Sequence, residues 1–197
     1  IRRCGKSFLL RTLYKQTLMK KGVKASSFIE IDLEKEEYAA YRNPVVLADY
    51  VRERTKDKRK KFYVFVDEIQ RSYKVKTSGV DENLVPEEDR ELLYTSFYDT
   101  LSSLMALPNV DVYVTGSNSK MLSSDIVTNF RDRGCEVKVY PLSLSEFYAY
   151  ADMEKAEALE EYLTYGGMPL AVIEQDESEK RKYLQDLHKN VYMKDIV

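Results

Sequence analysis

The chain of 197 residues has no tryptophan, one histidine and two cysteines. Cys4 and Cys135 form no metal-type or redox-type pair, and so few thiols favour a reducing, cytoplasmic setting. His188, the single histidine, has no partner at metal-ligand spacing. No run of about 18 apolar residues occurs, so we expect no membrane-spanning helix. The formal net charge of −2 gives no overall basic field, so composition does not favour a membrane or nucleic-acid partner.

What the chain does contain is an alternation of helical and extended patterns. Residues 8–21 carry apolar side chains three and four apart, and Gly22 follows as a helix stop. Residues 62–66 are almost continuously apolar, which is typical of a strand buried on both faces of a parallel sheet. Residues 71–91 are polar and predict a loop or insertion. Further strands are expected at 28–33, from 110 and from 135. Further helices are expected at 44–56, 92–107, 120–134, 154–175 and 178–197, with a break in the fourth at Gly166–Gly167. Another helix is expected to begin after a cap at Ser143 or Ser145.

The first residues, IRRCGKS, end in a tripeptide that is typical of a phosphate-binding loop. The full motif, G-x-x-x-x-G-K-[ST], would place its first glycine immediately before Ile1, and we expect that glycine and a preceding strand upstream. Gly5 allows a tight turn, and the backbone amides around it, from Arg3 and Cys4 to Phe8, are expected to point at an anion. Lys6 would neutralise the β- and γ-phosphates, and the Ser7 hydroxyl would bind Mg²⁺. Taken alone, the tripeptide has an alternative interpretation as a chance match in a loop.

A second motif follows the buried strand at 62–66. A phosphate loop of this kind requires an acidic residue at the end of a neighbouring strand, and FYVFVDEIQ supplies Asp67 and Glu68 there. Asp67 would hold Mg²⁺, and Glu68 would polarise the attacking water. A strand that ends in a solvated acidic turn is the plainer alternative. It does not explain why Gly5-Lys6-Ser7 opens a helix one strand earlier.

Two further groups of residues are weaker candidates. Thr115, Ser117 and Asn118 follow the next strand, and ligands bind at the carboxyl ends of strands in such sheets. We favour Asn118 as a γ-phosphate sensor, although these residues also suit a plain turn. Arg131 or Arg133 would serve as an arginine finger, in its own subunit or in a neighbour, which leaves an oligomer open. The alternative is that both are ordinary surface arginines.

The order of these motifs resembles one family. GKS, DEIQ, VTGSNSKMLS, FRDRG, VYPLSLSEF and YGGMP follow one another as in the prokaryotic AAA-type P-loop ATPases called AAA_14, "ATP-binding proteins" that carry a C-terminal DUF4143 domain. The resemblance implies that Ser7 and Asp67 bind the magnesium ion and that Lys6 binds the phosphates. It also implies that Glu68 is the catalytic acid and that Arg133 matches the arginine that the family has before the PLS segment. Two positions depart from the pattern, since Asp132 stands where the family usually has glycine and Cys135 often has an acidic counterpart. The DUF4143 domain is expected beyond Val197.

Together these patterns predict an α/β fold: a P-loop NTPase core at 1–148 with a mostly parallel sheet flanked by helices, and a small helical lid at 149–197. The predicted activity is Mg²⁺-dependent binding and hydrolysis of ATP, with ATP preferred over GTP only by resemblance. One alternative is a nucleotide-gated switch with little turnover that recruits an unknown protein partner. Another is a nucleic-acid-associated ATPase, which the basic run RERTKDKRKK at 52–61 suggests, although the net charge does not support it.

Overall fold

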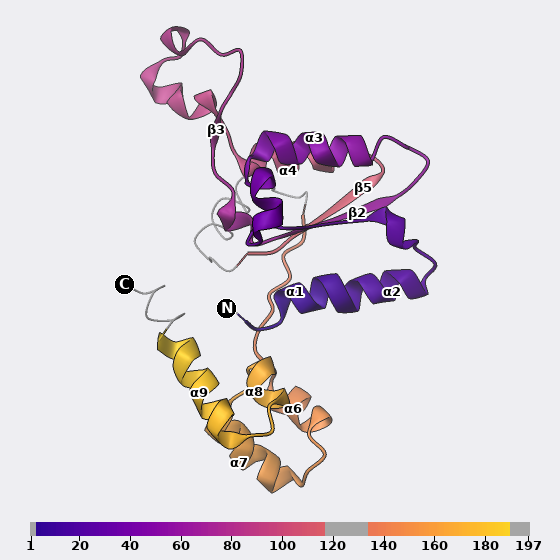
Figure 1. Ribbon diagram of the computed structural model, residues 1–197, viewed down its shortest axis with the longest axis vertical. Coiled ribbons are helices and arrows are strands. Elements are labelled where there is room, and N and C mark those ends of the chain that lie inside the picture. Colours follow the sequence, from indigo (N-terminus) through magenta and orange to yellow (C-terminus); the bar gives the residue numbers. More distant parts are fainter. Residues whose placement is uncertain (1–2, 117–133, 190–197) are drawn as a thin grey trace. The chain divides into compact units, whose positions relative to one another are not determined.

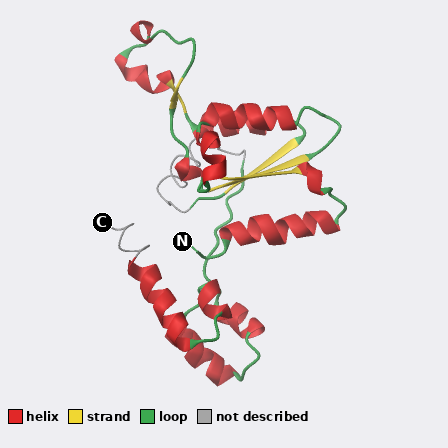
Figure 2. Ribbon diagram, in the orientation of Figure 1, coloured by secondary structure: helices red, strands yellow, loops and turns green. Residues whose placement is uncertain are grey.

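The computed structural model describes residues 3–116 and 134–189. The chain forms two compact units, one made of Ser7–Cys135 and the other of Ile1–Lys6 with Glu136–Val197. The first is an α/β unit and the second is helical (Figure 2). The predicted division into an ATPase core at 1–148 and a helical lid at 149–197 stays a prediction.

The α/β unit is built on a parallel sheet. Its described strands are β1 (Phe28–Asp32), β2 (Phe62–Asp67) and β5 (Val110–Val114), in the order β1-β2-β5. Both pairings are parallel, and the register places Asp32 opposite Asp67. Parallel pairing brings the carboxyl ends of all three strands to one edge of the sheet. The predicted fold class, a mostly parallel sheet flanked by helices, is confirmed.

Helices cover both faces of this sheet (Figure 1). On one face, α3 (Pro44–Arg54) and α4 (Phe97–Met105) pack on strand residues such as Ile31, Val64 and Val66, which are almost fully buried. On the other face lies a continuous helical segment of α1 (Lys6–Phe8), a π-helical stretch (Leu9–Tyr14) and α2 (Lys15–Lys20). Its Leu18 and Tyr14 pack on Phe28 and Phe65. The alternation of these side chains explains why residues 62–66 are apolar throughout.

Several of the described loops carry short 3₁₀ helices, and one of them forms an arm. In the arm, β3 (Val75–Lys76) and β4 (Tyr94–Thr95) pair antiparallel, and the loop that they enclose extends from the sheet (Figure 1). The predicted helix at 92–107 starts later than expected, at Phe97. The reason is a capping box, because Ser96 accepts from the backbone of Asp99 while the Asp99 carboxylate accepts from Ser96. The 3₁₀ helices are Ala25–Ser27, Glu36–Arg42, Ile69–Arg71, Glu82–Leu84 and Glu87–Leu93.

The second unit contains α6 (Leu144–Tyr150), α7 (Lys155–Tyr165), α8 (Pro169–Ile173) and α9 (Glu177–Leu187). Ser143 caps α6 in a capping box with Glu146, and hydrogen bonds from Ser143 hold the pKa of Glu146 below its ordinary value. The strand predicted from Cys135 is wrong. Residues 134–140 form neither helix nor strand, because no described strand lies beside them to supply a hydrogen-bond ladder, and Val137 is 73% exposed.

The predicted break at Gly166–Gly167 is confirmed, and Gly167 also permits a close approach of two backbones. The Leu142 amide donates to the Gly167 carbonyl at 2.7 Å, and a Cβ added at Gly167 would lie 1.9 Å from the Leu142 carbonyl oxygen. We therefore expect Gly167→Ala to destabilise the helical unit by about 1–3 kcal/mol, the range for overpacking. Chemical denaturation followed by circular dichroism measures this, with Gly134→Ala in the α/β unit as the control, because its Cβ would meet no atom of the described residues within 4 Å. Equal stability of the two variants would contradict the prediction.

Candidate functional site

Polar side chains from three strands meet at the carboxyl edge of the sheet. Asp67 is the last residue of β2 and only 3% exposed, and Asp32 is the last residue of β1. Thr115 follows β5, and its amide donates to the Val66 carbonyl at 2.9 Å. The Thr115 hydroxyl donates to Oδ1 of Asp67. The sheet therefore holds the Asp67 carboxylate in a fixed direction at this edge.

The helix that begins at Lys6 adds a cation to the same edge. Arg11 Nη1 donates to Oδ2 of Asp32 at 3.0 Å and lies 3.7 Å from Oδ2 of Asp67. Arg11 stands four residues after Ser7, so both residues lie on the same side of the helix. The arrangement thus joins the helix that carries Ser7 to the carboxylate of Asp67, within the unit Ser7–Cys135.

Sequence reasoning missed both Arg11 and Asp32. The signals that could have found them are local. Arg11 is one helical turn beyond the serine of the GKS tripeptide, and Asp32 ends a predicted strand parallel to the one that Asp67 ends. A second ion pair extends the cluster, because Glu30 lies 3.8 Å from Arg11 Nε and also contacts the Lys15 ammonium.

Glu68 has an unusual backbone conformation directly after this edge. Its φ of 57° and ψ of 52° lie in the left-handed region, which a non-glycine residue adopts at a cost of about 1–3 kcal/mol. The Glu68 amide donates to the Thr115 hydroxyl at 3.4 Å, and the Ile69 amide donates to the Thr115 carbonyl at 3.0 Å. Gln70 donates a hydrogen bond to the Glu68 carboxylate. The turn therefore holds Glu68 next to Asp67 in a strained conformation of the kind that clusters at functional sites.

The tripeptide itself lies at the boundary between the two units, which falls between Lys6 and Ser7. Gly5 has a φ of 93°, which favours glycine, and Arg3 also has a positive φ of 58°. Cys4 is buried, and its thiol donates to the Val139 carbonyl at 3.2 Å. Lys6 Nζ lies 3.9 Å from the Cys4 sulfur.

The structure brings some of the predicted site residues together, and others lie outside the described residues. It brings Asp67, Glu68 and the helix of Ser7 to one edge of the sheet, and it leaves the Phe8 side chain 59% exposed on that helix. The predicted role of the Phe8 backbone amide stays a prediction. The predicted sensor Asn118 and the two arginines, Arg131 and Arg133, lie outside the described residues.

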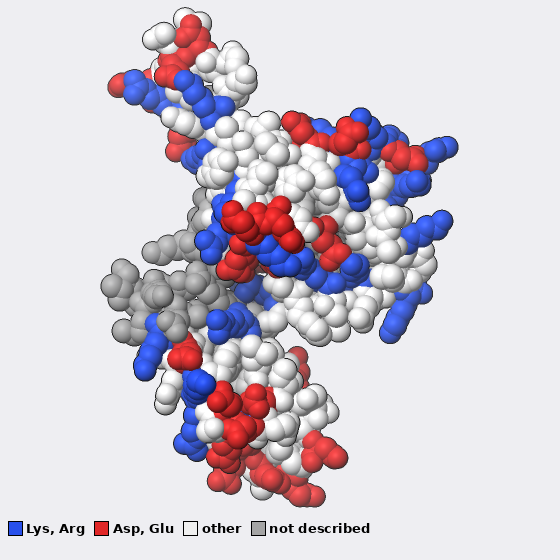
Figure 3. Space-filling model, in the orientation of Figure 1, with Lys and Arg blue, Asp and Glu red and all other residues white. Residues whose placement is uncertain are grey.

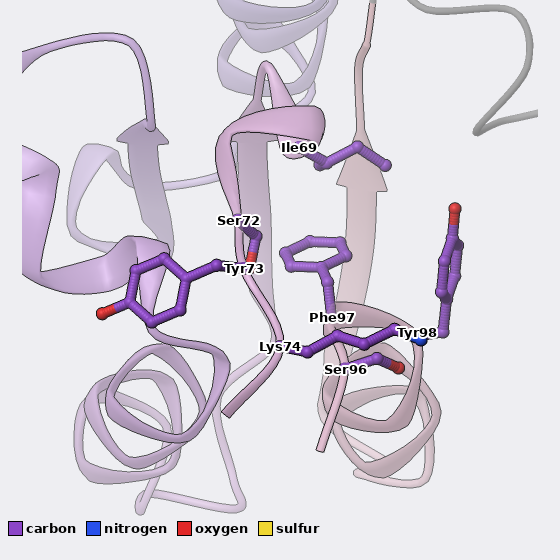
Figure 4. A pocket seen from close by; sticks show the side chains of 7 residues that line it. All are labelled: Ile69, Ser72, Tyr73, Lys74, Ser96, Phe97 and Tyr98. Carbon is purple, nitrogen blue, oxygen red and sulfur yellow. The ribbon is translucent and has the colours of Figure 1, made fainter. Parts of the chain in front are cut away.

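A small pocket lies beside the turn that follows Glu68 (Figure 4). Its lining is mostly apolar, with the Phe97 ring directed toward Ile69, and Lys74 is its one charged side chain. Such a lining offers no carboxylate to a metal and a single cation to a phosphate. The pocket is lined by Ile69, Ser72, Tyr73, Lys74, Ser96, Phe97 and Tyr98.

Comparison with known proteins identifies the family. The profile of an AAA domain family, AAA_14, matches residues 1–148, which include the tripeptide, Asp67 and Glu68. The chain belongs to this AAA family. Membership indicates a nucleotide-binding ATPase domain, and the resemblance noted in the sequence is confirmed.

The curated relatives of this AAA domain are uncharacterized proteins. One, from Haemophilus influenzae, is 26% identical over 201 residues, which cover the whole chain and 44% of that protein. Another, from Methanocaldococcus jannaschii, is 31% identical over 99 residues, which cover 44% of the chain and 22% of that protein. The chain spans less than half the length of the relatives it matches.

The donor set suits a magnesium ion bound together with a nucleotide. Across residues 3–116 and 134–189 no group of three or more His, Cys, Asp or Glu side chains is placed to hold a metal. Mg²⁺ that accompanies a nucleotide takes only one or two protein oxygens, and phosphates and water supply the rest. Asp67 at the sheet edge and a hydroxyl on the adjoining helix are donors of that kind. In the same described segments no helix is long and apolar enough to cross a membrane.

Proposed function

We propose that this AAA domain binds ATP with Mg²⁺ and hydrolyses it. The observation that carries the proposal is the contact between the Ser7 helix and the metal-side carboxylate, in which Arg11 lies 3.7 Å from Asp67 one turn after Ser7. A phosphate loop must deliver its serine to the acidic end of a buried strand. Arg11 belongs to the helix that follows Ser7, so its contact with Asp67 supports the proposal that this helix and this strand end serve one site.

The chain's residues divide the work of binding between phosphates and metal. Backbone amides around Gly5 and the Lys6 ammonium hold the phosphates, and the positive φ of Gly5 supports a tight turn there. The Ser7 hydroxyl and Asp67 would hold Mg²⁺, whose positive charge offsets the charge that develops on the phosphates. Thr115 fixes the direction of Asp67 through its hydroxyl.

Hydrolysis requires a group that orients and polarises water, and Glu68 is that group in this proposal. Its carboxylate follows Asp67 directly, and its left-handed turn is tied to Thr115. Asn118 would sense the γ-phosphate. Arg131 or Arg133 would stabilise charge in the transition state, from the same subunit or from a neighbour.

The basic run at 52–61 gives a nucleic-acid role little support. Asp57 lies 3.1 Å from Arg59 and 3.4 Å from Lys60, and the hydrogen bond from Arg59 lowers the pKa of Asp57. Lys56 pairs with Glu53, and Lys61 pairs with Asp111. On the face shown in Figure 3, basic and acidic side chains are interspersed over this unit. Lys56, Arg59, Lys60 and Lys61 are therefore each paired with a neighbouring carboxylate.

The magnesium side is tested by Asp67→Asn in the full-length protein. Asparagine keeps the shape of the side chain and can still accept from Thr115, so we expect ATP to bind without its Mg²⁺-dependent gain in affinity. Titration with ATP in Mg²⁺ and in EDTA measures this gain. Asp111→Asn, at a half-exposed carboxylate on β5, is the control and should behave as the wild type does. A full Mg²⁺ gain in Asp67→Asn would contradict the assignment.

A further inference from the structure

The cluster of Arg11, Asp32 and Asp67 has a role that the proposed function leaves unassigned. We infer that Asp32 is a positioning residue, which anchors the Arg11 guanidinium so that it lies beside Asp67 without closing on it. Oδ2 of Asp67 is thereby kept for a divalent cation. This inference rests on the proposed function, since it takes Asp67 as the magnesium-side carboxylate.

The distances show which carboxylate holds the arginine. The same nitrogen, Nη1 of Arg11, is 3.0 Å from Asp32 Oδ2 and 3.7 Å from Asp67 Oδ2. The first distance is that of a charge-assisted hydrogen bond, and the second is too long for one. Oδ1 of Asp67 already accepts the Thr115 hydroxyl. The other oxygen of Asp67 therefore faces a cation that a second carboxylate holds.

Asp32 is itself held in the orientation that this role requires. Its Oδ1 accepts the Glu34 amide at 3.1 Å, which directs Oδ2 toward Arg11. The strand register places Asp32 opposite Asp67, so the two carboxylates flank the guanidinium from neighbouring strands. The side chains of Arg11, Asp32 and Asp67 are 22%, 14% and 5% exposed. Charges so well shielded from water are screened less than surface ion pairs.

The charges of the cluster do not balance. Among the described residues, its three carboxylates, Glu30, Asp32 and Asp67, form ion pairs with two cations, Arg11 and Lys15. Lys15 contacts Glu30, so within the described part of the chain Arg11 is the cation beside the two aspartates at the strand ends. A surplus of negative charge at Asp67 attracts a divalent ion. If Arg11 moved fully onto Asp67, it would remove that attraction.

The test is the Mg²⁺ dependence of ATP binding in Asp32→Asn. A neutral amide holds a guanidinium weakly, so Arg11 is expected to shift onto Oδ2 of Asp67 and compete with the metal. The Mg²⁺ concentration for half-maximal ATP binding should rise about tenfold, while ATP affinity in EDTA stays within about twofold, because one weakened charge-assisted hydrogen bond is worth about 1.4 kcal/mol. The double variant Arg11→Gln/Asp32→Asn removes the competitor and should restore the wild-type Mg²⁺ requirement.

A matched control and a stability measurement distinguish a positioning role of Asp32 from a purely structural one. Glu34→Gln removes a charge two residues away that pairs with Arg71 at 3.4 Å, and it should leave the Mg²⁺ requirement unchanged. A purely structural role would lower ATP affinity equally with and without Mg²⁺, together with the unfolding temperature, and the double variant would not recover. That result would overturn the inference. A wild-type protein whose ATP binding shows no Mg²⁺ dependence would overturn the proposed function as well.

Discussion

Replacing Lys6 by alanine is expected to weaken ATP binding by about a hundredfold or more. The ammonium is the only side-chain cation of the Gly5-Lys6-Ser7 tripeptide, and the triphosphate carries the charge that it neutralises. Truncating one partner of a buried, hydrogen-bonded charge pair costs about 2–5 kcal/mol, and each 1.4 kcal/mol is a factor of ten in affinity. Isothermal titration of ATP with Mg²⁺ into the full-length protein measures the loss.

The matched control for this substitution is Lys20→Ala. Lys20 is an exposed lysine in the last turn of the same helical segment, remote from its start. Both variants lose one positive charge, so a general electrostatic effect on ATP would appear in both. Only the Lys6 variant should lose affinity. Equal binding by the two variants would show that the tripeptide is not a phosphate loop.

Replacing Glu68 by glutamine is expected to reduce steady-state hydrolysis by about 10² to 10⁴, the range that a general base contributes. ATP affinity should stay close to the wild-type value, because Glu68 is assigned to the water and not to the phosphates. Glutamine keeps the length of the side chain, and the backbone contacts of the turn with Thr115 do not depend on the carboxylate. Phosphate release at saturating ATP measures the rate.

The control is Glu88→Gln, which removes one carboxylate from the exposed arm between β3 and β4. It should hydrolyse ATP at the wild-type rate. Unchanged hydrolysis in Glu68→Gln would remove Glu68 from the mechanism. A wild-type protein that binds ATP tightly and turns none over would instead support the nucleotide-gated switch.

The sheet could be predicted because its signals are local and strong. The apolar run that forms β2 needs burial on both faces, and α2, α3 and α4 supply that burial. The start of the first helix at Lys6 and its end before Gly22 also follow from residues close in sequence. The position of Asp67 and Glu68 at the end of β2 could be predicted for the same reason, because the apolar run before them is recognisable, and their roles stay predictions.

The remainder depends on contacts through space. Arg11 lies 21 residues from Asp32 in sequence, and only the parallel register of β1 and β2 brings Asp32 and Asp67 to the same guanidinium. The segment from Cys135 has the alternation of a strand, yet a strand requires a neighbour, and none of those described pairs with it. The two short strands of the arm, β3 and β4, could not be predicted for the same reason, because each is a strand only through its pairing with the other. The pattern of apolar and polar residues along the chain does not show which strands pair or which side chains meet.

The most direct measurement of the central claim is a double-mutant cycle on Lys6 and Asp67, read by ATP affinity in Mg²⁺. If both residues serve one Mg²⁺–ATP complex, each single substitution, Lys6→Ala or Asp67→Asn, weakens binding, and the double variant is weakened by clearly less than the product of the two effects. Unchanged affinity in both single variants, or fully independent effects, would contradict a shared nucleotide site.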